Sequence, residues 1–152
     1  MASRLHEQQI PFALGGSGML HLLGLTDEVG DLDLQAPTAA HDAVREAAGR
    51  WWVDSHRETR RIWRSAWIAQ LQVGREPVEV IGGLALIDDG GVRRIPLRAT
   101  RDADVDGVPI PLADPALWWV VYRAYRPDKA GLLEQVVSAT ARRRALTETA
   151  SD

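Results

Sequence analysis

Short hydrophobic runs, separated by glycine, proline and acidic residues, divide the first third of the chain into predicted strands and helices. The apolar run 12–14 predicts a buried strand that ends in glycines. Ser17 is a suitable N-cap for a following helix, which Gly24 is expected to end. In 31–34, aspartate and leucine alternate with a period of two, which predicts a half-buried strand. A second helix is predicted over 38–48.

The middle of the chain predicts a series of short strands. Their apolar residues alternate with polar ones or form brief runs rich in β-branched and aromatic residues. Asp106-Gly107 is a typical hairpin signal. The predicted strands are 51–53, 62–71, 77–81, 92–97 and 105–112.

The end of the chain predicts a pair of helices. Asp114 and Pro115 are residue types of an N-cap and a first helical position, and this helix is expected to extend to Tyr125. Pro127 interrupts the pattern, and the last helix is expected over 128–145. The order of strand, helix, strand, helix, several strands and two helices predicts a mixed α/β (α+β) domain.

Composition narrows the class of protein. The chain has 152 residues, of which 45% are hydrophobic and 26% are charged, so we expect one globular domain. We place its core in 10–112 and its C-terminal helices in 114–146. The absence of cysteine excludes disulfides and thiolate chemistry. A net charge of −3 argues against a general nucleic-acid binder. With no long apolar run and no signal-peptide pattern, we expect a cytoplasmic protein without a membrane partner.

Three carboxylates carry the candidate metal chemistry. Asp31 and Asp33 lie two residues apart on one predicted strand, so their side chains are expected on the same face. A divalent cation can balance their repulsion, and Mg²⁺ prefers such oxygen ligands. Glu79 stands alone among apolar residues on a second predicted strand. If the two strands are neighbours, the three side chains form a two-metal phosphoryl-transfer site. Otherwise they are solvated positions on alternating strands.

A glycine-rich turn precedes the first predicted helix. Gly15, Gly16 and Ser17 lead from the first strand into this helix. Glycines allow a phosphate to approach the backbone, and a helix N-terminus offers free N–H groups. The turn lacks the Gly-Lys-Ser/Thr ending of a P-loop. A tight strand-to-helix connection without a ligand is the alternative.

Together these motifs resemble the polymerase-β-type nucleotidyltransferase superfamily. The sequences that carry the resemblance are GGSGMLHLLGL at 15–25, DLDL at 31–34 and VEVIGG at 78–83. The segment 113–136 is similar to one found in the small stand-alone group of lincosamide and aminoglycoside nucleotidyltransferases and abortive-infection-type toxins. The resemblance implies a minimal nucleotidyltransferase fold, with a mixed β-sheet flanked by helices and a C-terminal helical pair.

The resemblance also implies roles for residues. The turn at Gly15, Gly16 and Ser17 would hold a triphosphate, and Asp31 and Asp33 would bind Mg²⁺. Glu79 would share a metal or take the proton from an acceptor hydroxyl, and Lys129 would touch phosphate. The implied reaction is Mg²⁺-dependent transfer of a nucleoside monophosphate from an NTP to a hydroxyl, with release of pyrophosphate.

The sequence is compatible with more than one nucleotide, acceptor and activity. We favour ATP and a small-molecule acceptor over RNA, although no motif for base recognition is present. Asp27 and Glu28 are unfavourable near a triphosphate, which supports a catalytically degenerate binding module as one alternative. A toxin-like member acting on tRNA is another. It is disfavoured by net charge but not by the arginines at 57, 60, 61 and 64. A shallow site completed by a second subunit would make the protein a homodimer.

Overall fold

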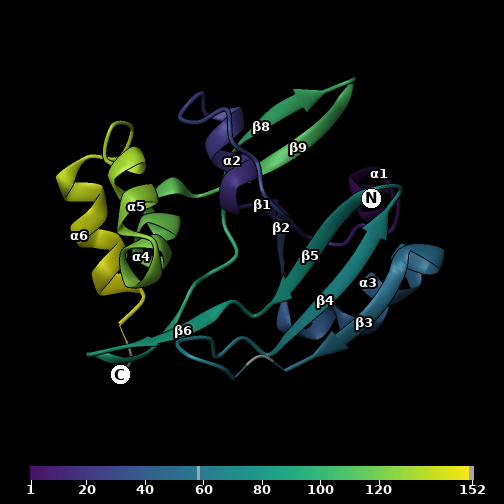
Figure 1. Cartoon of the computed structure of the whole chain (residues 1–152), viewed down its shortest axis with the longest axis horizontal. Coiled ribbons are helices and arrows are strands. Elements are labelled where there is room, and N and C mark those ends of the chain that lie inside the picture. Colours follow the sequence, from purple (N-terminus) through teal and green to yellow (C-terminus); the bar gives the residue numbers. More distant parts are fainter. Residues whose placement is uncertain (58, 151–152) are drawn as a thin grey trace.

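A seven-stranded mixed β-sheet forms the centre of the structure, a computed structural model that describes residues 1–57 and 59–150 (Figure 1). The strand order is β3-β4-β5-β2-β1-β9-β8. β2 is parallel to β5 and β1 is parallel to β9, whereas the other neighbours are antiparallel. The strands are β1 (Ala13–Leu14), β2 (Leu32–Ala36), β3 (Trp52–His56), β4 (Trp67–Val73), β5 (Glu76–Gly82), β8 (Ala99–Val105) and β9 (Val108–Ala113).

Helices lie at the back and at one end of this sheet. In Figure 1, α1 and α3 lie behind β3, β4 and β5, and α4, α5 and α6 form a separate group at the left. His41, at the start of α3, packs edge-on against Trp67 of β4, with ring centroids 5.2 Å apart. The helices are α1 (Ala2–Glu7), α2 (Gly16–Leu22), α3 (His41–Ala48), α4 (Pro115–Tyr125), α5 (Pro127–Leu133) and α6 (Ala139–Glu148). Short 3₁₀ turns at Thr38–Ala40 and Gly49–Trp51 flank α3, and β6 (Ala85–Asp88) and β7 (Gly91–Arg94) form a separate hairpin.

The predicted α+β class and several predicted elements are confirmed. β1, α2, β2 and β5 lie where the hydrophobic pattern placed them, although α2 ends at Leu22 and β2 begins at Leu32. Helix α4 also begins as predicted. A carboxylate oxygen of Asp114 accepts a hydrogen bond from the backbone N–H of Ala116 at 2.8 Å, as expected of an N-cap.

The prediction of one strand over 62–71 is wrong. Only the part from Trp67 onward belongs to β4. The preceding residues form a turn that follows the positive φ of Arg61, a single antiparallel bridge from Trp63 to Leu86, and a bend at Ala66. The Arg64 guanidinium stabilises this segment, because it donates hydrogen bonds to the carbonyl oxygens of Thr59, Arg61 and Trp63. The many aromatic and apolar residues indicated a strand where backbone–side-chain contacts produce a loop.

The predicted strand 105–112 is in fact the second half of a hairpin. Asp106 and Gly107 both have positive φ, at 52° and 80°, and they connect β8 to β9. Two positive φ angles are typical of the turn that joins antiparallel strands. β8 itself was not predicted, because its sequence, ATRDADV, is mostly polar and its residues are mostly exposed.

The C-terminal helical pair is a group of three helices. The predicted helix 128–145 is interrupted between α5 and α6, where Ser138 caps α6 by accepting a hydrogen bond from the N–H of Ala141 at 3.2 Å. A capping serine competes with helix continuation. Helix α1 was also not predicted from the sequence. Among the residues described, no helix is long and apolar enough to cross a membrane.

Candidate active site

Asp33 and Glu79 lie directly opposite each other on neighbouring parallel strands. β2 pairs with β5 in a register that places Asp33 against Glu79 and Leu34 against Val80. Because side chains alternate across a sheet, the two carboxylates share one face, while Leu34 and Val80 are buried on the other. Asp31 is exposed and lies one residue before β2 begins, so the strand itself positions only one of the two predicted aspartates.

The carboxyl group of Asp33 is buried beside other acidic side chains. The pKa of Asp33 is raised to about 7, first by burial and then by the charges of Glu79 and Asp31, while Lys129 acts in the opposite direction. Burial and like charges both disfavour the ionised form of a carboxyl group. A cation bound between these side chains would remove the repulsion.

The glycine turn fits closely against this carboxylate. The backbone N–H of Gly15 donates a hydrogen bond to the carbonyl oxygen of Asp33 at 2.9 Å. Gly16 has a positive φ of 59°, and a Cβ atom added there would overlap with the carboxylate of Asp33. A Cβ at Gly15 would overlap with the ring of Trp118. Glycine is therefore needed at both positions by space and, at Gly16, also by backbone conformation.

Ser17 has a different position from the one predicted. Gly15, not Ser17, is the N-cap of α2, so the capping prediction is wrong. Ser17 is 4% exposed, and its Oγ accepts a hydrogen bond from the N–H of Gly30 at 2.9 Å. Its hydroxyl also lies 3.5 Å from the carbonyl oxygen of Asp31. Ser17 thus attaches the segment that leads to Asp31 to the first turn of α2.

Helices α4 and α5 bring further side chains to the candidate site. Of these, the sequence analysis identified only Lys129. Lys129 lies with its ammonium 5.5 Å from the ring centroid of Tyr122. The ring of Tyr122 lies 5.6 Å from that of Trp118 and 5.9 Å from that of Tyr125. Burial, followed by neighbouring charges that include Asp33, raises the pKa of both tyrosines. The aromatic spacing along 118–125 was the available signal, but it is equally typical of a core helix.

The chemistry of Asp33 and Glu79 suits a divalent cation. Both supply oxygen donors of the kind that Mg²⁺ prefers, and the charge of Glu79 acts on the buried carboxyl group of Asp33. In the described part of the chain, no three histidine, aspartate or glutamate side chains are grouped as a metal site. Asp31 is exposed, but its charge is close enough to contribute to the raised pKa of Asp33. The assignment of Asp31, Asp33 and Glu79 to a metal remains a prediction.

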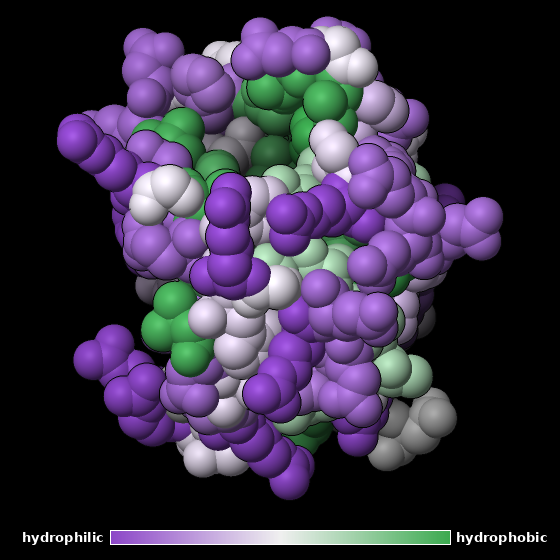
Figure 2. Space-filling model, turned by 90° about the vertical axis from the view of Figure 1, so that its right-hand side faces the viewer, coloured by the Kyte–Doolittle hydropathy of each residue, from purple (hydrophilic) through white to green (hydrophobic). Residues whose placement is uncertain are grey.

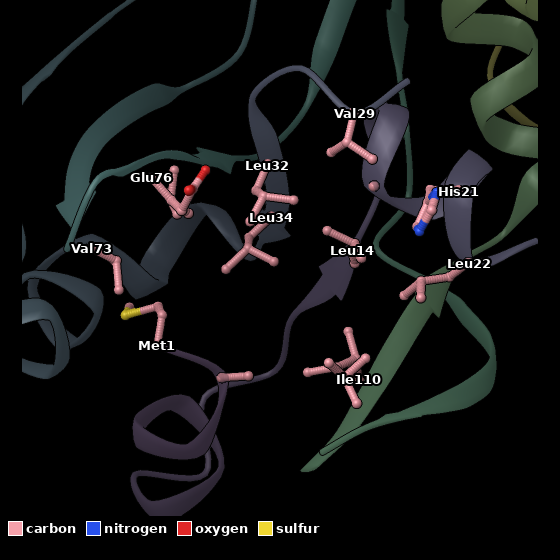
Figure 3. Close-up of a pocket in the computed structure, with 14 residues that line it drawn as sticks. Met1, Leu14, His21, Leu22, Val29, Leu32, Leu34, Val73, Glu76 and Ile110 are labelled. Atoms are coloured by element: carbon pink, nitrogen blue, oxygen red, sulfur yellow. The ribbon is translucent and has the colours of Figure 1, made fainter. Parts of the chain in front are cut away.

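A separate apolar cavity of about 390 Å³ lies on the opposite face of β2. Figure 3 shows Leu32 and Leu34 of β2, Leu14 of β1 and Ile110 of β9 pointing into it. Figure 2, which views the molecule from the right of Figure 1, shows a hollow lined by hydrophobic residues on this side. The strand that carries Asp33 therefore separates the carboxylates from an apolar space.

Comparison with known proteins identifies the class of fold. No protein-family model and no curated protein matches the sequence. The solved structures that match include a candidate nucleotidyltransferase and the antibiotic-resistance factor ANT(2″)-Ia, and this likeness shows that the chain shares their fold.

Three of these structures superpose on most of this chain. A candidate nucleotidyltransferase from Thermotoga maritima superposes with a TM-score of 0.70 and 19% identity, covering 89% of this chain and 86% of the other. The solution structure of the antibiotic-resistance factor ANT(2″)-Ia gives a TM-score of 0.59 at 14% identity, over 95% of this chain and 84% of that one. The crystal structure of ANT(2″)-Ia with adenylyl-2″-tobramycin gives 0.55 at 15% identity, over 97% and 94%. At these identities the similarity establishes the fold.

Proposed function

We propose that this protein is a Mg²⁺-dependent nucleotidyltransferase, which transfers a nucleoside monophosphate from an NTP to a hydroxyl group. The observation that carries the proposal is the alignment of Asp33 with Glu79 on adjacent parallel strands. Beside them lies a turn in which only glycine fits at position 16. A pair of metal-binding carboxylates beside a glycine-rich turn at a helix N-terminus is an arrangement that suits nucleotidyl transfer. The solved structures with this fold support the same reaction class.

The proposed reaction is an in-line displacement at the α-phosphorus. The acceptor oxygen forms a bond to this phosphorus, the bond to the bridging oxygen breaks, and pyrophosphate leaves. Mg²⁺ held by Asp31, Asp33 and Glu79 would lower the pKa of the acceptor hydroxyl and neutralise the leaving group. Glu79 either completes this ligand set or accepts the proton of the hydroxyl. The turn from Gly15 to Ser17 and the ammonium of Lys129 would orient the triphosphate.

We propose ATP as the first nucleotide to test and a small molecule as the acceptor. One protein of this fold, ANT(2″)-Ia, was solved with an adenylylated antibiotic, which supports both choices. The net charge of −3 also disfavours an extended RNA acceptor. Growth arrest on expression, with modified tRNA, would instead favour the toxin-like alternative. The homodimer remains a prediction that analytical ultracentrifugation tests.

The decisive experiment is calorimetric titration with each NTP, with and without Mg²⁺. It compares the wild type with the Asp31→Asn/Asp33→Asn double variant. We expect binding that needs both the metal and the aspartates. Metal-independent binding, or unchanged binding by the variant, would contradict the assignment of the site.

A nucleotide-binding module without transferase activity is the second candidate. It is favoured by the exposure of Asp31, which leaves the three carboxylates ungrouped. Release of pyrophosphate from ATP in the presence of a panel of hydroxyl acceptors distinguishes the two functions. NTP binding without release for any acceptor would favour the binding module.

A further inference from the structure

Two buried hydrogen-bond donors on α4 have no partner within the described residues. They are the indole Nε1 of Trp118 and the hydroxyl of Tyr122, and their side chains are 2% and 1% exposed. Leaving such a group unpaired costs about 1–3 kcal/mol, so a partner is expected in some state of the protein. These residues are four apart, and therefore lie on the same face of α4.

That face of α4 is directed at the candidate active site. The Nε1 atom of Trp118 lies 2.6 Å from the position that a Cβ atom on Gly15 would occupy, so it contacts the strand-to-helix turn. The ring of Tyr122 lies 5.6 Å from the ring of Trp118, and its centroid is 5.5 Å from the ammonium of Lys129. Trp118 therefore reaches the turn itself, and Tyr122 lies beside Trp118 with a cation close to its ring.

We propose that Trp118 and Tyr122 are positioning residues for the nucleotide, and that their N–H and O–H groups donate to oxygens of its triphosphate. This inference rests on the proposed function. A triphosphate supplies many anionic acceptors, and hydrogen bonds to charged acceptors are stronger than those between neutral groups. Because both atoms are covered in this structure, the ligand reaches them only when α4 moves away from the turn. At these two donors the movement breaks no hydrogen bond, since neither has a partner within the described residues.

The main test compares two substitutions that each remove one buried hydroxyl. Tyr122→Phe removes the unpaired hydroxyl, and Thr149→Val removes one that donates to the carbonyl oxygen of Ala145 at 2.8 Å on α6. Calorimetry with Mg²⁺·ATP and with Mg²⁺·tripolyphosphate gives the binding constants, and thermal melting without ligand gives the stabilities.

We expect one variant to change ligand binding and the other to change stability. Tyr122→Phe should keep or raise the melting temperature and weaken binding of both ligands about tenfold, as expected for loss of a hydrogen bond to a charged group. Thr149→Val should lower the melting temperature and leave both binding constants unchanged. Binding by Tyr122→Phe within twofold of wild type would overturn the proposal, since the hydroxyl would then serve only the fold. Weaker binding of ATP alone would overturn the assignment to the triphosphate.

Trp118 is tested by a measurement on the wild type. Its indole N–H resonance, assigned by its absence in Trp118→Phe, should shift when Mg²⁺·tripolyphosphate binds, whereas an unmoved resonance would contradict its role. If wild type binds no nucleotide, the proposed function fails together with this inference. If Asp33→Asn abolishes binding but Tyr122→Phe does not change it, only this inference fails.

Discussion

Asp33 faces Glu79 across the parallel pair of β2 and β5, and the turn at Gly16 closes against its carboxylate. The charge of Glu79 therefore acts on a buried carboxyl group that the turn holds in place, and it helps to raise the pKa of Asp33. Such an arrangement costs stability in the free protein, and a bound cation recovers that stability. Proteins commonly retain costly charge at functional sites for this reason.

Asp33→Asn should stabilise the free protein and abolish its function. Removing the charge relieves the cost of burial and the repulsion that together raise the pKa of Asp33, which we expect to add on the order of 1–2 kcal/mol after allowance for solvent screening. Chemical denaturation measures this gain, and pyrophosphate release measures the loss of activity. Asp54→Asn is the matched control, because Asp54 is exposed on β3. A control variant that gained equal stability would show that net charge, rather than the pair, is responsible.

Stability should fall as the pH rises from about 4 to about 7. The pKa of Asp33 is raised from 3.8 to about 7 in the folded chain, so the folded state binds a proton more tightly than the unfolded state. The stabilising proton is fully present below the lower value and is lost as the pH passes the higher one. Melting temperatures should therefore decline across this window in wild type and less in Asp33→Asn. Mg²⁺ should raise the melting temperature more at pH 8 than at pH 5.5, because it competes with the proton.

Gly16→Ala should be far more harmful than Gly24→Ala. Both glycines have positive φ, at 59° and 73°, so each substitution carries a backbone cost of about 1 kcal/mol. Only at Gly16 would the added Cβ also overlap with Asp33, whereas nothing lies within 4 Å at Gly24. We expect a loss of about 3 kcal/mol or more at Gly16 and loss of nucleotide binding. Equal unfolding free energies for the two variants would show that the turn has room for a side chain.

Ser17→Ala should loosen the segment that leads to Asp31. The variant loses the hydrogen bond from the N–H of Gly30, and we expect a cost of about 1 kcal/mol. Amide hydrogen exchange should become faster at Gly30 and remain unchanged at Ala116, whose N–H is held by Asp114. If exchange at Gly30 does not change, the Ser17 contact does not restrain this segment.

The elements that the sequence predicted are those in which local pattern and tertiary contacts agree. The alternation around Leu32 and Leu34 predicts a strand with one face turned toward the core, and β2 packs in this way. The errors arise where a side chain redirects the backbone. The guanidinium of Arg64 holds the start of an aromatic-rich run in a loop, and the polar β8 forms because β9 pairs with it. Such effects depend on partners far from the local pattern.

The site was predictable in its residue types and less so in its contacts. Spacing and resemblance indicated Asp33 and Glu79, and strand pairing places them together. The contact of Ser17 with Gly30 and the unpaired donors of α4 depend on where separate elements meet. Tryptophan and tyrosine at helical spacing indicate only a buried face, so their approach to the turn could not be read from the sequence.

Substitutions in the apolar cavity behind β2 should affect the carboxylates on the opposite face of the strand. Leu34 lines this cavity and precedes Gln35 on the strand whose register aligns Asp33 with Glu79. A substitution that repacks the cavity would tilt the strand and move the carboxylate by a fraction of an ångström. Suppressors of a weak allele at Glu79 should therefore arise among hydrophobic positions such as Leu14 and Leu34. Selection that acts on the candidate site would then also act on residues that lie outside it.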